Sequence, residues 1–213
     1  MILKKLIITV DGPAGSGKGK ISKYISSKYK LKHLDSGVLY RRVAFLLLKE
    51  NINLKNRVKI STFLDQINYI SMRQSKILRT EQISKISSKI AKLHSVRNFV
   101  NFQQRKIVEN SIKNKGFVID GRDIGSVVFK KAKIKLYIQV NEKIRAERRH
   151  KQLIDIGEKS IYPKILKEIK LRDKKDKTRK ISPLVIPKGA YIIDNSHSFR
   201  VTIKKIREVI GKL

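Results

Sequence analysis

The sequence predicts an α/β protein built on a central parallel β-sheet flanked by helices. Short apolar runs at residues 6–10, 117–119 and 134–140 are typical of buried strands. Segments with apolar residues at helical spacing separate these runs, and polar residues follow each run directly. In an open sheet of this kind ligands bind beyond the carboxyl ends of the strands. We therefore expect Asp11, Asp120 and Asp194, which follow three of the strands, to lie near one edge.

The first fifty residues predict the order strand, loop, helix, strand, helix. The opening strand ends at Asp11-Gly12-Pro13, a typical turn sequence. Apolar residues then recur at helical spacing up to Lys28, and Asn51 is a plausible stop for a later helix. The expected elements are a strand over 6–10, a helix over 18–28, a strand over 31–34 and a helix over 38–49.

The middle of the chain has a less regular pattern, which predicts an insert. Residues 53–75 combine a helix-like piece with a short strand-like run at 67–72. Two helices are expected next, over 80–93 and 95–114, the first capped by Thr80 and the second closed by Gly116.

The last third returns to the alternating pattern. Strands are expected over 117–119, 134–140 and 191–193, and a helix over 142–156 leads into a loop at Gly157. A chain of 213 residues suits one α/β domain with an embellishment.

Composition excludes several classes of protein. Cysteine is absent, which rules out disulfides and thiolate metal sites and fits a reducing cytoplasm. Lysines interrupt every apolar stretch before it reaches the roughly 18 residues that a membrane-spanning helix needs. Asp11 likewise interrupts the N-terminal run too early for a signal peptide. We expect a cytoplasmic protein with no membrane association, and a monomer.

The formal net charge of +34 has two explanations. A basic field attracts polyanions, so a nucleic-acid partner is one. The other is a general enrichment in lysine, and we favour it because the lysines are spread along the whole chain and no RNA-binding or zinc motif accompanies them.

A glycine-rich loop follows the first strand and fits the pattern G-x-x-x-x-G-K. Its glycines let backbone N–H groups turn inward around a triphosphate, the following helix adds its positive end, and the lysine ammonium reaches the β and γ oxygens. Such a loop binds phosphate whatever the reaction, although a glycine-rich turn without a ligand is the alternative. The predicted ATP-binding residues are Gly12, Pro13, Ala14, Gly15, Ser16, Gly17 and Lys18.

Gly19 and Lys20 follow, where the usual Ser or Thr is missing. A G-K-G sequence followed by a hydroxyl residue is the form found in nucleoside-monophosphate kinases, so Gly19 fits and Lys20 departs. We count both among the ATP-binding residues. No protein ligand for a metal is certain: our hypothesis is that Mg²⁺ enters with ATP, held mainly by phosphates, water and Ser16, and that the Lys20 ammonium partly replaces its charge.

Four further clusters give the chain a resemblance to a known family over nearly its full length. They are L-D-S-G-V-L-Y-R at 34–41, R-T-E at 79–81 with Ser88 and V-R at 96–97, I-D-G-R-D-I-G-S-V-V-F at 119–129, and L-R-D-K-K-D-K-T-R at 171–179 with S-P-L at 182–184. The third cluster is the most specific. The chain resembles the bacterial cytidylate kinases.

The resemblance implies the P-loop kinase fold and a reaction in which ATP, with Mg²⁺, phosphorylates CMP or dCMP. It also implies a core at about 1–52, 95–145 and 181–213, an insert that binds the nucleoside monophosphate at about 53–94, and a short lid at about 146–180.

By the same resemblance nine residues bind the acceptor nucleotide. Arg41 can take a phosphate in two parallel charge-assisted bonds, and a carboxylate at Asp123 that accepts from an exocyclic amino group would favour cytosine over uracil. The set is Ser36, Tyr40, Arg41, Ser88, Arg97, Arg122, Asp123, Asp176 and Arg179.

On the donor side the resemblance assigns arginines within the lid and directly before it. Arg145, Arg148 and Arg149 share one helical segment and could converge on the ATP phosphates. Arg172 would contact the transferring phosphates, so we predict Lys18, Arg148 and Arg172 as the catalytic residues. Solvated helix charges are the alternative for the lid arginines, and a structural salt bridge is the alternative for Arg122 with Asp123.

Two other functions compete with this one. A kinase of the same fold could act on UMP, dTMP, AMP or shikimate, and Asp123 with Ser88 favours cytosine against these. A P-loop ATPase associated with RNA would explain the charge, but we expect nucleotides rather than nucleic acid as partners.

Overall fold

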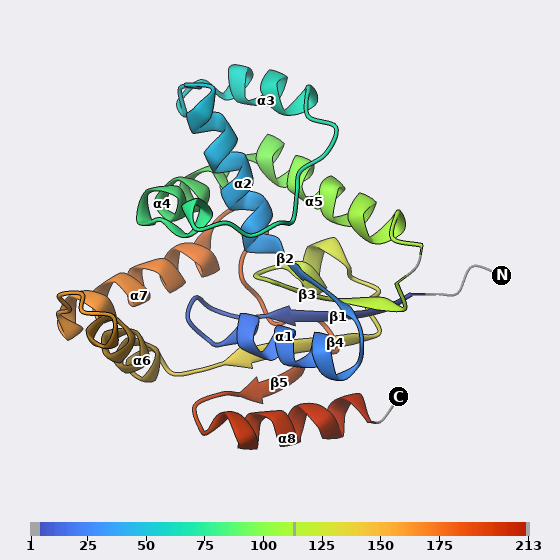
Figure 1. Cartoon of the computed structure of the whole chain (residues 1–213), viewed down its shortest axis with the longest axis vertical. Coiled ribbons are helices and arrows are strands. Elements are labelled where there is room, and N and C mark those ends of the chain that lie inside the picture. Colours follow the sequence, from blue (N-terminus) through green and yellow to red (C-terminus); the bar gives the residue numbers. More distant parts are fainter. Residues whose placement is uncertain (1–4, 113, 212–213) are drawn as a thin grey trace. The chain divides into compact units, whose positions relative to one another are not determined.

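A computed structural model describes residues 5–112 and 114–211 of the chain (Figure 1). The elements alternate between strands and helices as expected, and the chain divides into two compact units. The first comprises residues 1–33 and 117–213, and the second residues 34–116. No helix within the described part is long and apolar enough to span a membrane. The predicted boundaries of core, insert and lid stay a prediction.

The described part of the chain has five strands, which form one sheet in the order β2-β3-β1-β4-β5. β1 pairs with β4 in parallel, with Ile8 opposite Ile134, and β4 pairs with β5 in parallel, with Leu136 opposite Tyr191. The prediction of a parallel sheet is therefore confirmed. The strands are β1 (Leu6–Asp11), β2 (Lys32–Asp35), β3 (Gly116–Gly121), β4 (Ile134–Gln139) and β5 (Tyr191–Asp194).

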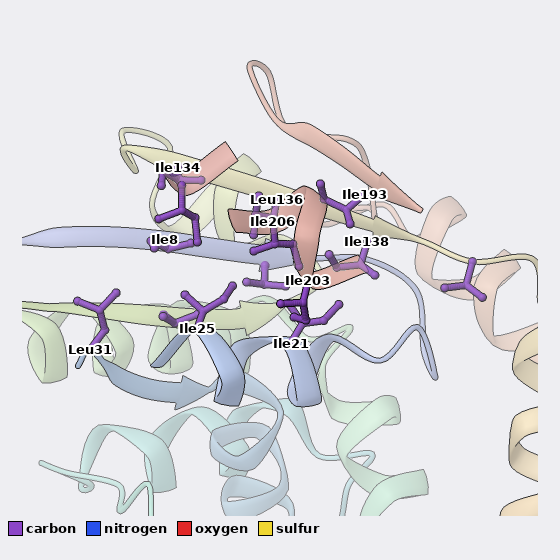
Figure 2. Close-up of a cluster of buried hydrophobic side chains, with 14 residues drawn as sticks. Ile8, Ile21, Ile25, Leu31, Ile134, Leu136, Ile138, Ile193, Ile203 and Ile206 are labelled. Carbon is purple, nitrogen blue, oxygen red and sulfur yellow. The ribbon is translucent and has the colours of Figure 1, made fainter. Parts of the chain in front are cut away.

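The core of the first unit packs strands against two helices, α1 (Lys18–Lys28) and α8 (Phe199–Ile210). Figure 2 shows Ile8 of β1 among the side chains of β4, α1 and α8. Ile8, Ile21 and Ile206 have no exposed surface. Burying such a side chain contributes about 1.5–3 kcal/mol, so this cluster anchors α1 and α8 to the sheet.

Two more helices of this unit, α6 (Glu142–Asp155) and α7 (Tyr162–Thr178), pack side by side after β4 (Figure 1). Asn141 caps α6 by accepting from the Lys143 N–H at 2.8 Å. The expected helix over 142–156 is confirmed to within one residue. No helix was predicted over the residues of α7; Ile165 is the one residue of this helix described as buried, so the helix has little apolar periodicity in the sequence.

The second unit is helical. It contains α2 (Ser36–Lys49), α3 (Arg57–Asp65), the short 3₁₀ turn η1 (Ile77–Arg79), α4 (Glu81–Ile90) and α5 (His94–Glu109). Thr80 caps α4 as expected, with its side chain accepting from the Ile83 N–H.

Two expectations for this unit were wrong. Residues 67–72 form no strand; the side chain of Gln103 binds the backbone of Asn68 and Ile70 instead, at 3.2 and 3.4 Å, which satisfies polar groups that a sheet would otherwise pair. α5 ends at Glu109 rather than near 114, and Gly116 opens β3 instead of closing the helix.

Candidate active site

The phosphate loop joins β1 to α1, and its glycines are required by its shape. Gly17 has a φ of 84°, and a Cβ there would lie 2.5 Å from Nδ2 of Asn195. Within the described residues no side chain caps α1, so the positive end of this helix can face an anion. The loop therefore has the geometry of a phosphate site.

Lys18 is buried and folded back over this loop. Its Nζ donates to the Pro13 carbonyl at 2.7 Å and lies 3.4 Å from the Ser16 hydroxyl. Burial, followed by the nearby Arg122 guanidinium, holds the pKa of Lys18 well below its ordinary value, although Asp120, Asp11 and others oppose the shift. An anion beside Nζ would restore the charged form, which suits this lysine to a phosphate ligand.

Lys20, which we predicted to bind ATP, contacts an aromatic ring on α8. Its ammonium lies 4.2 Å from the centroid of the Phe199 ring on α8. This is a cation–π contact on the outside of the unit, because Lys20 is exposed. The geometry gives no support to the predicted role of Lys20 in replacing charge at the triphosphate.

Asp11, at the end of β1, holds the segment that carries the G-R-D sequence. Its buried carboxylate accepts from the backbone N–H groups of Ile124 and Gly125 at 2.8 and 2.7 Å. Burial raises the pKa of Asp11 to about 6, against the lowering effect of these two bonds. Asp11 thus fixes the position of Arg122 and Asp123 relative to the end of β1.

Four residues predicted to bind the acceptor come together in alternating charge. Nε of Arg122 donates to Oδ2 of Asp176 at 3.1 Å. Nη2 of Arg179 lies 3.7 Å from Oδ1 of Asp123, and its Nη1 lies 3.9 Å from Oδ1 of Asp176. We call Arg122, Asp123, Asp176 and Arg179 the charged quartet. Its members Arg122 and Asp176 both influence the pKa of Lys18, which places the quartet within electrostatic reach of the phosphate loop.

Arg145, which we predicted to bind ATP, uses most of its N–H donors in hydrogen bonds within the protein. Nε donates to the Val140 carbonyl at 3.1 Å and Nη1 to the Ala14 carbonyl at 2.9 Å. Nη1 and Nη2 also bind the two carboxylate oxygens of Asp173 at 3.1 and 2.5 Å. A guanidinium has five N–H donors, and these bonds occupy four of them. Arg145 therefore ties α6 to both the phosphate loop and α7.

Arg148, predicted as catalytic, is bound to the backbone that follows β5. Nη1 donates to the Asn195 carbonyl at 2.9 Å, and Nη2 to the carbonyls of Ser196 and His197, each at 3.2 Å. Arg149 is exposed and donates to the side chain of Gln152 at 3.0 Å. Arg172, the third predicted catalytic residue, is exposed on α7.

The second unit holds the other predicted acceptor residues. The Arg97 guanidinium, only 2% exposed, lies 5.7 Å from the Tyr40 ring centroid and donates to the Ala91 carbonyl at 3.0 Å. Nη1 of Arg41 is 4.0 Å from Oδ2 of Asp35. Ser36 is buried at the start of α2, and Ser88 is exposed on α4.

A family model for cytidylate kinase matches residues 8–212. The chain belongs to the cytidylate kinase family. It is 36% identical to the cytidylate kinase of Bartonella tribocorum over 194 residues, which cover 91% of this chain and 88% of that protein. It is 37% identical to the cytidylate kinase of Rickettsia bellii, over 91% of this chain and 86% of that protein. It is 38% identical to the cytidylate kinase of Thermosipho africanus, over 95% of this chain and 93% of that protein.

Two solved structures share the fold of this cytidylate kinase family member at low sequence identity. TT1252 from Thermus thermophilus matches with a TM-score of 0.52 and 13% identity, covering 98% of both chains. A shikimate kinase from Bacteroides thetaiotaomicron matches with a TM-score of 0.50 and 10% identity, covering 97% of this chain and 98% of that one. The predicted kinase fold is confirmed.

Sequence reasoning missed one buried residue beside the phosphate loop of this cytidylate kinase family member. Nδ2 of Asn195 donates to the Ser16 carbonyl at 2.9 Å, and its Oδ1 accepts from the Thr202 hydroxyl at 2.8 Å. Its position directly after β5, at the carboxyl end of a strand, is the signal that could have found it.

A second missed contact pairs His33 with Asp120. Nε2 of His33 lies 2.7 Å from Oδ1 of Asp120, and both side chains are largely buried. The other carboxylate oxygen of Asp120 faces the start of α1, because it lies 3.9 Å from where a Cβ on Gly19 would stand. We expected Asp120 at this edge of the sheet. Its pairing with His33 could not be predicted, because the two residues are far apart in the sequence.

Proposed function

We propose that this chain transfers the γ-phosphoryl group of ATP to the phosphate of CMP or dCMP, forming ADP and the cytidine diphosphate. Membership of the cytidylate kinase family supports the activity. The observation that carries the proposal for the site is the charged quartet, which lies within electrostatic reach of Lys18 in one compact unit. The glycine loop supplies the donor side and the quartet supplies part of the acceptor side.

On the donor side the phosphate loop and α1 would bind the triphosphate. Lys18 would leave the Pro13 carbonyl for a phosphate oxygen and become fully charged there. No general base is needed, because the acceptor is already an anionic phosphate. Catalysis would come from aligning the CMP oxygen with the γ-phosphorus and neutralising charge on the transferring group.

On the acceptor side Arg122 and Arg179 would hold CMP while their carboxylate partners keep them oriented. The pairs of Arg179 are long, at 3.7 and 3.9 Å, and its side chain is largely buried, so a nucleotide that takes their place must supply its own charged or polar partners. Asp123 would then accept from the cytosine amino group. Uracil has a carbonyl oxygen at that position, so the carboxylate would repel it.

The second unit supplies further acceptor residues in this proposal. Arg41 would bind the monophosphate, since its contact with Asp35 is 4.0 Å long and about a quarter to a third of each side chain is exposed. Ser36 and Tyr40 would line the nucleotide, and Ser88 and Arg97 would contact the base.

The described residues fit a Mg²⁺ ion that is held mainly by ATP. No three His, Asp or Glu side chains among them gather into a metal site. Mg²⁺ ordinarily keeps several waters and binds substrate phosphates with one or two protein groups. Ser16, buried at the loop, and Asp120, facing the start of α1, would hold it in this way. When bound, the ion neutralises charge on the β and γ oxygens.

A monomeric state and a cytoplasmic location stay predictions. The absence of a nucleic-acid partner is a prediction as well. Because the net charge of +34 would attract RNA, it needs a test of its own. If an RNA-associated ATPase were the true function, RNA would stimulate ATP hydrolysis without CMP.

The deciding experiment is an assay of ADP release across CMP, dCMP, UMP, dTMP, AMP and shikimate. We expect CMP or dCMP to be the fastest acceptor, and Lys18→Ala to abolish the reaction with every acceptor. Equal rates with UMP and CMP would refute the cytosine assignment, and ATP hydrolysis that responds to RNA alone would favour the rival function.

A further inference from the structure

We propose that Asp173 is a positioning residue through which α7 couples ATP binding to CMP binding. This inference rests on the proposed function, because it uses the donor and acceptor roles assigned there. It adds a residue that has no direct role at either ligand. The coupling runs through two carboxylates of α7 in the same compact unit: Asp173 binds Arg145 of α6, which contacts the phosphate loop, and Asp176 binds Arg122.

The first link joins α7 to the phosphate loop. Asp173 binds Arg145 through both carboxylate oxygens, at 3.1 and 2.5 Å, and the Arg145 side chain is only 2% exposed. The same Arg145 donates to the Ala14 carbonyl within the loop at 2.9 Å. Two parallel bonds to a carboxylate fix the plane of a guanidinium, so Asp173 sets the direction of the bond to Ala14.

The second link joins α7 to the acceptor residues. Asp176 lies three residues after Asp173, which places both carboxylates on the same side of the helix. Asp176 accepts from Nε of Arg122 at 3.1 Å and lies 3.9 Å from Nη1 of Arg179. Its carbonyl also accepts from the Leu184 N–H at 2.8 Å, which holds the chain that follows α7.

A helix is stiff over one turn, so a small shift of α7 moves both carboxylates together. In the proposed function a triphosphate would draw Lys18 away from the Pro13 carbonyl, next to Ala14, and CMP would engage Arg122 and Arg179. Each ligand therefore favours one position of α7, and we propose that the other ligand binds best to the same position. The energetic consequence is a coupling between the two ligands, and such coupling must be the same in both directions.

The test measures that coupling directly by calorimetry. The dissociation constant of CMP is measured with and without saturating Mg²⁺ and the non-hydrolysable donor AMP-PNP, and the reciprocal titration is measured with saturating CMP. For the wild type we expect each ligand to tighten the other by about five- to tenfold. In Asp173→Asn this factor should fall to near one, with a much smaller change in the affinity for either ligand alone.

Glu168→Gln is the matched control, because it removes the same charge from an exposed site on the same helix. It should keep the wild-type factor. Should Asp173→Asn fail to fold, Asp173→Glu keeps the charge while displacing the carboxylate, and we expect it to reduce the factor as well.

Three outcomes overturn the inference: a wild type without coupling, a folded Asp173 variant with the full factor, or a variant that weakens both ligands equally and leaves the factor unchanged. A wild type that neither binds nor phosphorylates CMP would overturn the proposed function too. A wild type that phosphorylates CMP but shows one of the three outcomes would overturn this inference alone.

Discussion

The side-chain amide of Asn195 donates to the Ser16 carbonyl at 2.9 Å, which joins the end of β5 to the phosphate loop across 179 residues of sequence. Both polar atoms of this amide are used, because its oxygen accepts from Thr202. The phosphate loop therefore depends on a buried group from the C-terminal part of the chain.

Asn195→Asp should weaken both the fold and ATP binding. A carboxylate cannot donate to the Ser16 carbonyl and would face it at short range, so we expect a loss of about 1–3 kcal/mol in the free energy of unfolding. Urea unfolding and the KM for ATP check this. Arg200→Gln, at an exposed site nearby on α8, is the control; equal KM values for the two variants would contradict the prediction.

Gly125→Ala should impair CMP binding more than ATP binding. A Cβ at this residue would lie 2.7 Å from the Thr9 hydroxyl and 3.2 Å from Oδ2 of Asp11, so the segment carrying Arg122 must shift. Steady-state kinetics should show a larger rise in the KM for CMP than for ATP. Ser126→Ala is the neighbouring control, because its buried hydroxyl has no hydrogen-bond partner among the residues that the structure describes and its loss should have little effect.

Asp11 should make stability depend on pH. Its pKa is about 6 in the fold against 3.8 ordinarily, so the fold binds a proton more tightly than the unfolded chain does. This contribution to stability is complete below about pH 4 and is lost as the pH rises through about 6, a change of about 3 kcal/mol.

The comparison with Asp11→Asn isolates this effect from other titrating groups. The advantage of the wild type over the variant in the free energy of unfolding should shrink between pH 4 and pH 7. Urea unfolding at both values measures it. A difference between the two proteins that does not vary with pH would refute the prediction.

Asp123→Asn should raise the KM for CMP while leaving the KM for ATP nearly unchanged. An amide can present its N–H₂ group to the cytosine amino group, so a hydrogen bond worth about 1–3 kcal/mol is lost, or roughly 5- to 150-fold in affinity. Asp155→Asn, exposed on α6, is the control. An equal loss for both substrates would show that Asp123 has a structural role instead.

Lys20→Met should lower stability slightly without affecting ATP. Its cation–π contact with Phe199 is worth about 0.5–1 kcal/mol at an exposed site. A double-mutant cycle with Phe199→Leu measures this interaction, and the KM for ATP at several Mg²⁺ concentrations measures any role at the triphosphate. A raised KM would restore the charge-replacing role that we first expected of Lys20.

Local patterns in the chain were enough to predict most of the fold. The apolar runs around Ile8, Phe117 and Leu136 predicted the strands, because a buried parallel strand needs continuous apolar residues. The glycine spacing before Lys18 predicted the phosphate loop for the same kind of local reason. The strand expected at 67–72 failed because Gln103, distant in sequence, satisfies that backbone instead.

The candidate site divides along the same line. The amino-acid sequence sufficed to place a phosphate loop after β1, and the family resemblance named the four residues of the charged quartet among nine candidates. Only the tertiary structure could assign Arg145 to Asp173 and Ala14, Arg148 to the carbonyls after β5, and Asn195 to the loop. The sequence around an arginine does not show whether its side chain will bind a phosphate or a backbone carbonyl. Its partner depends on segments distant in sequence that folding brings next to it.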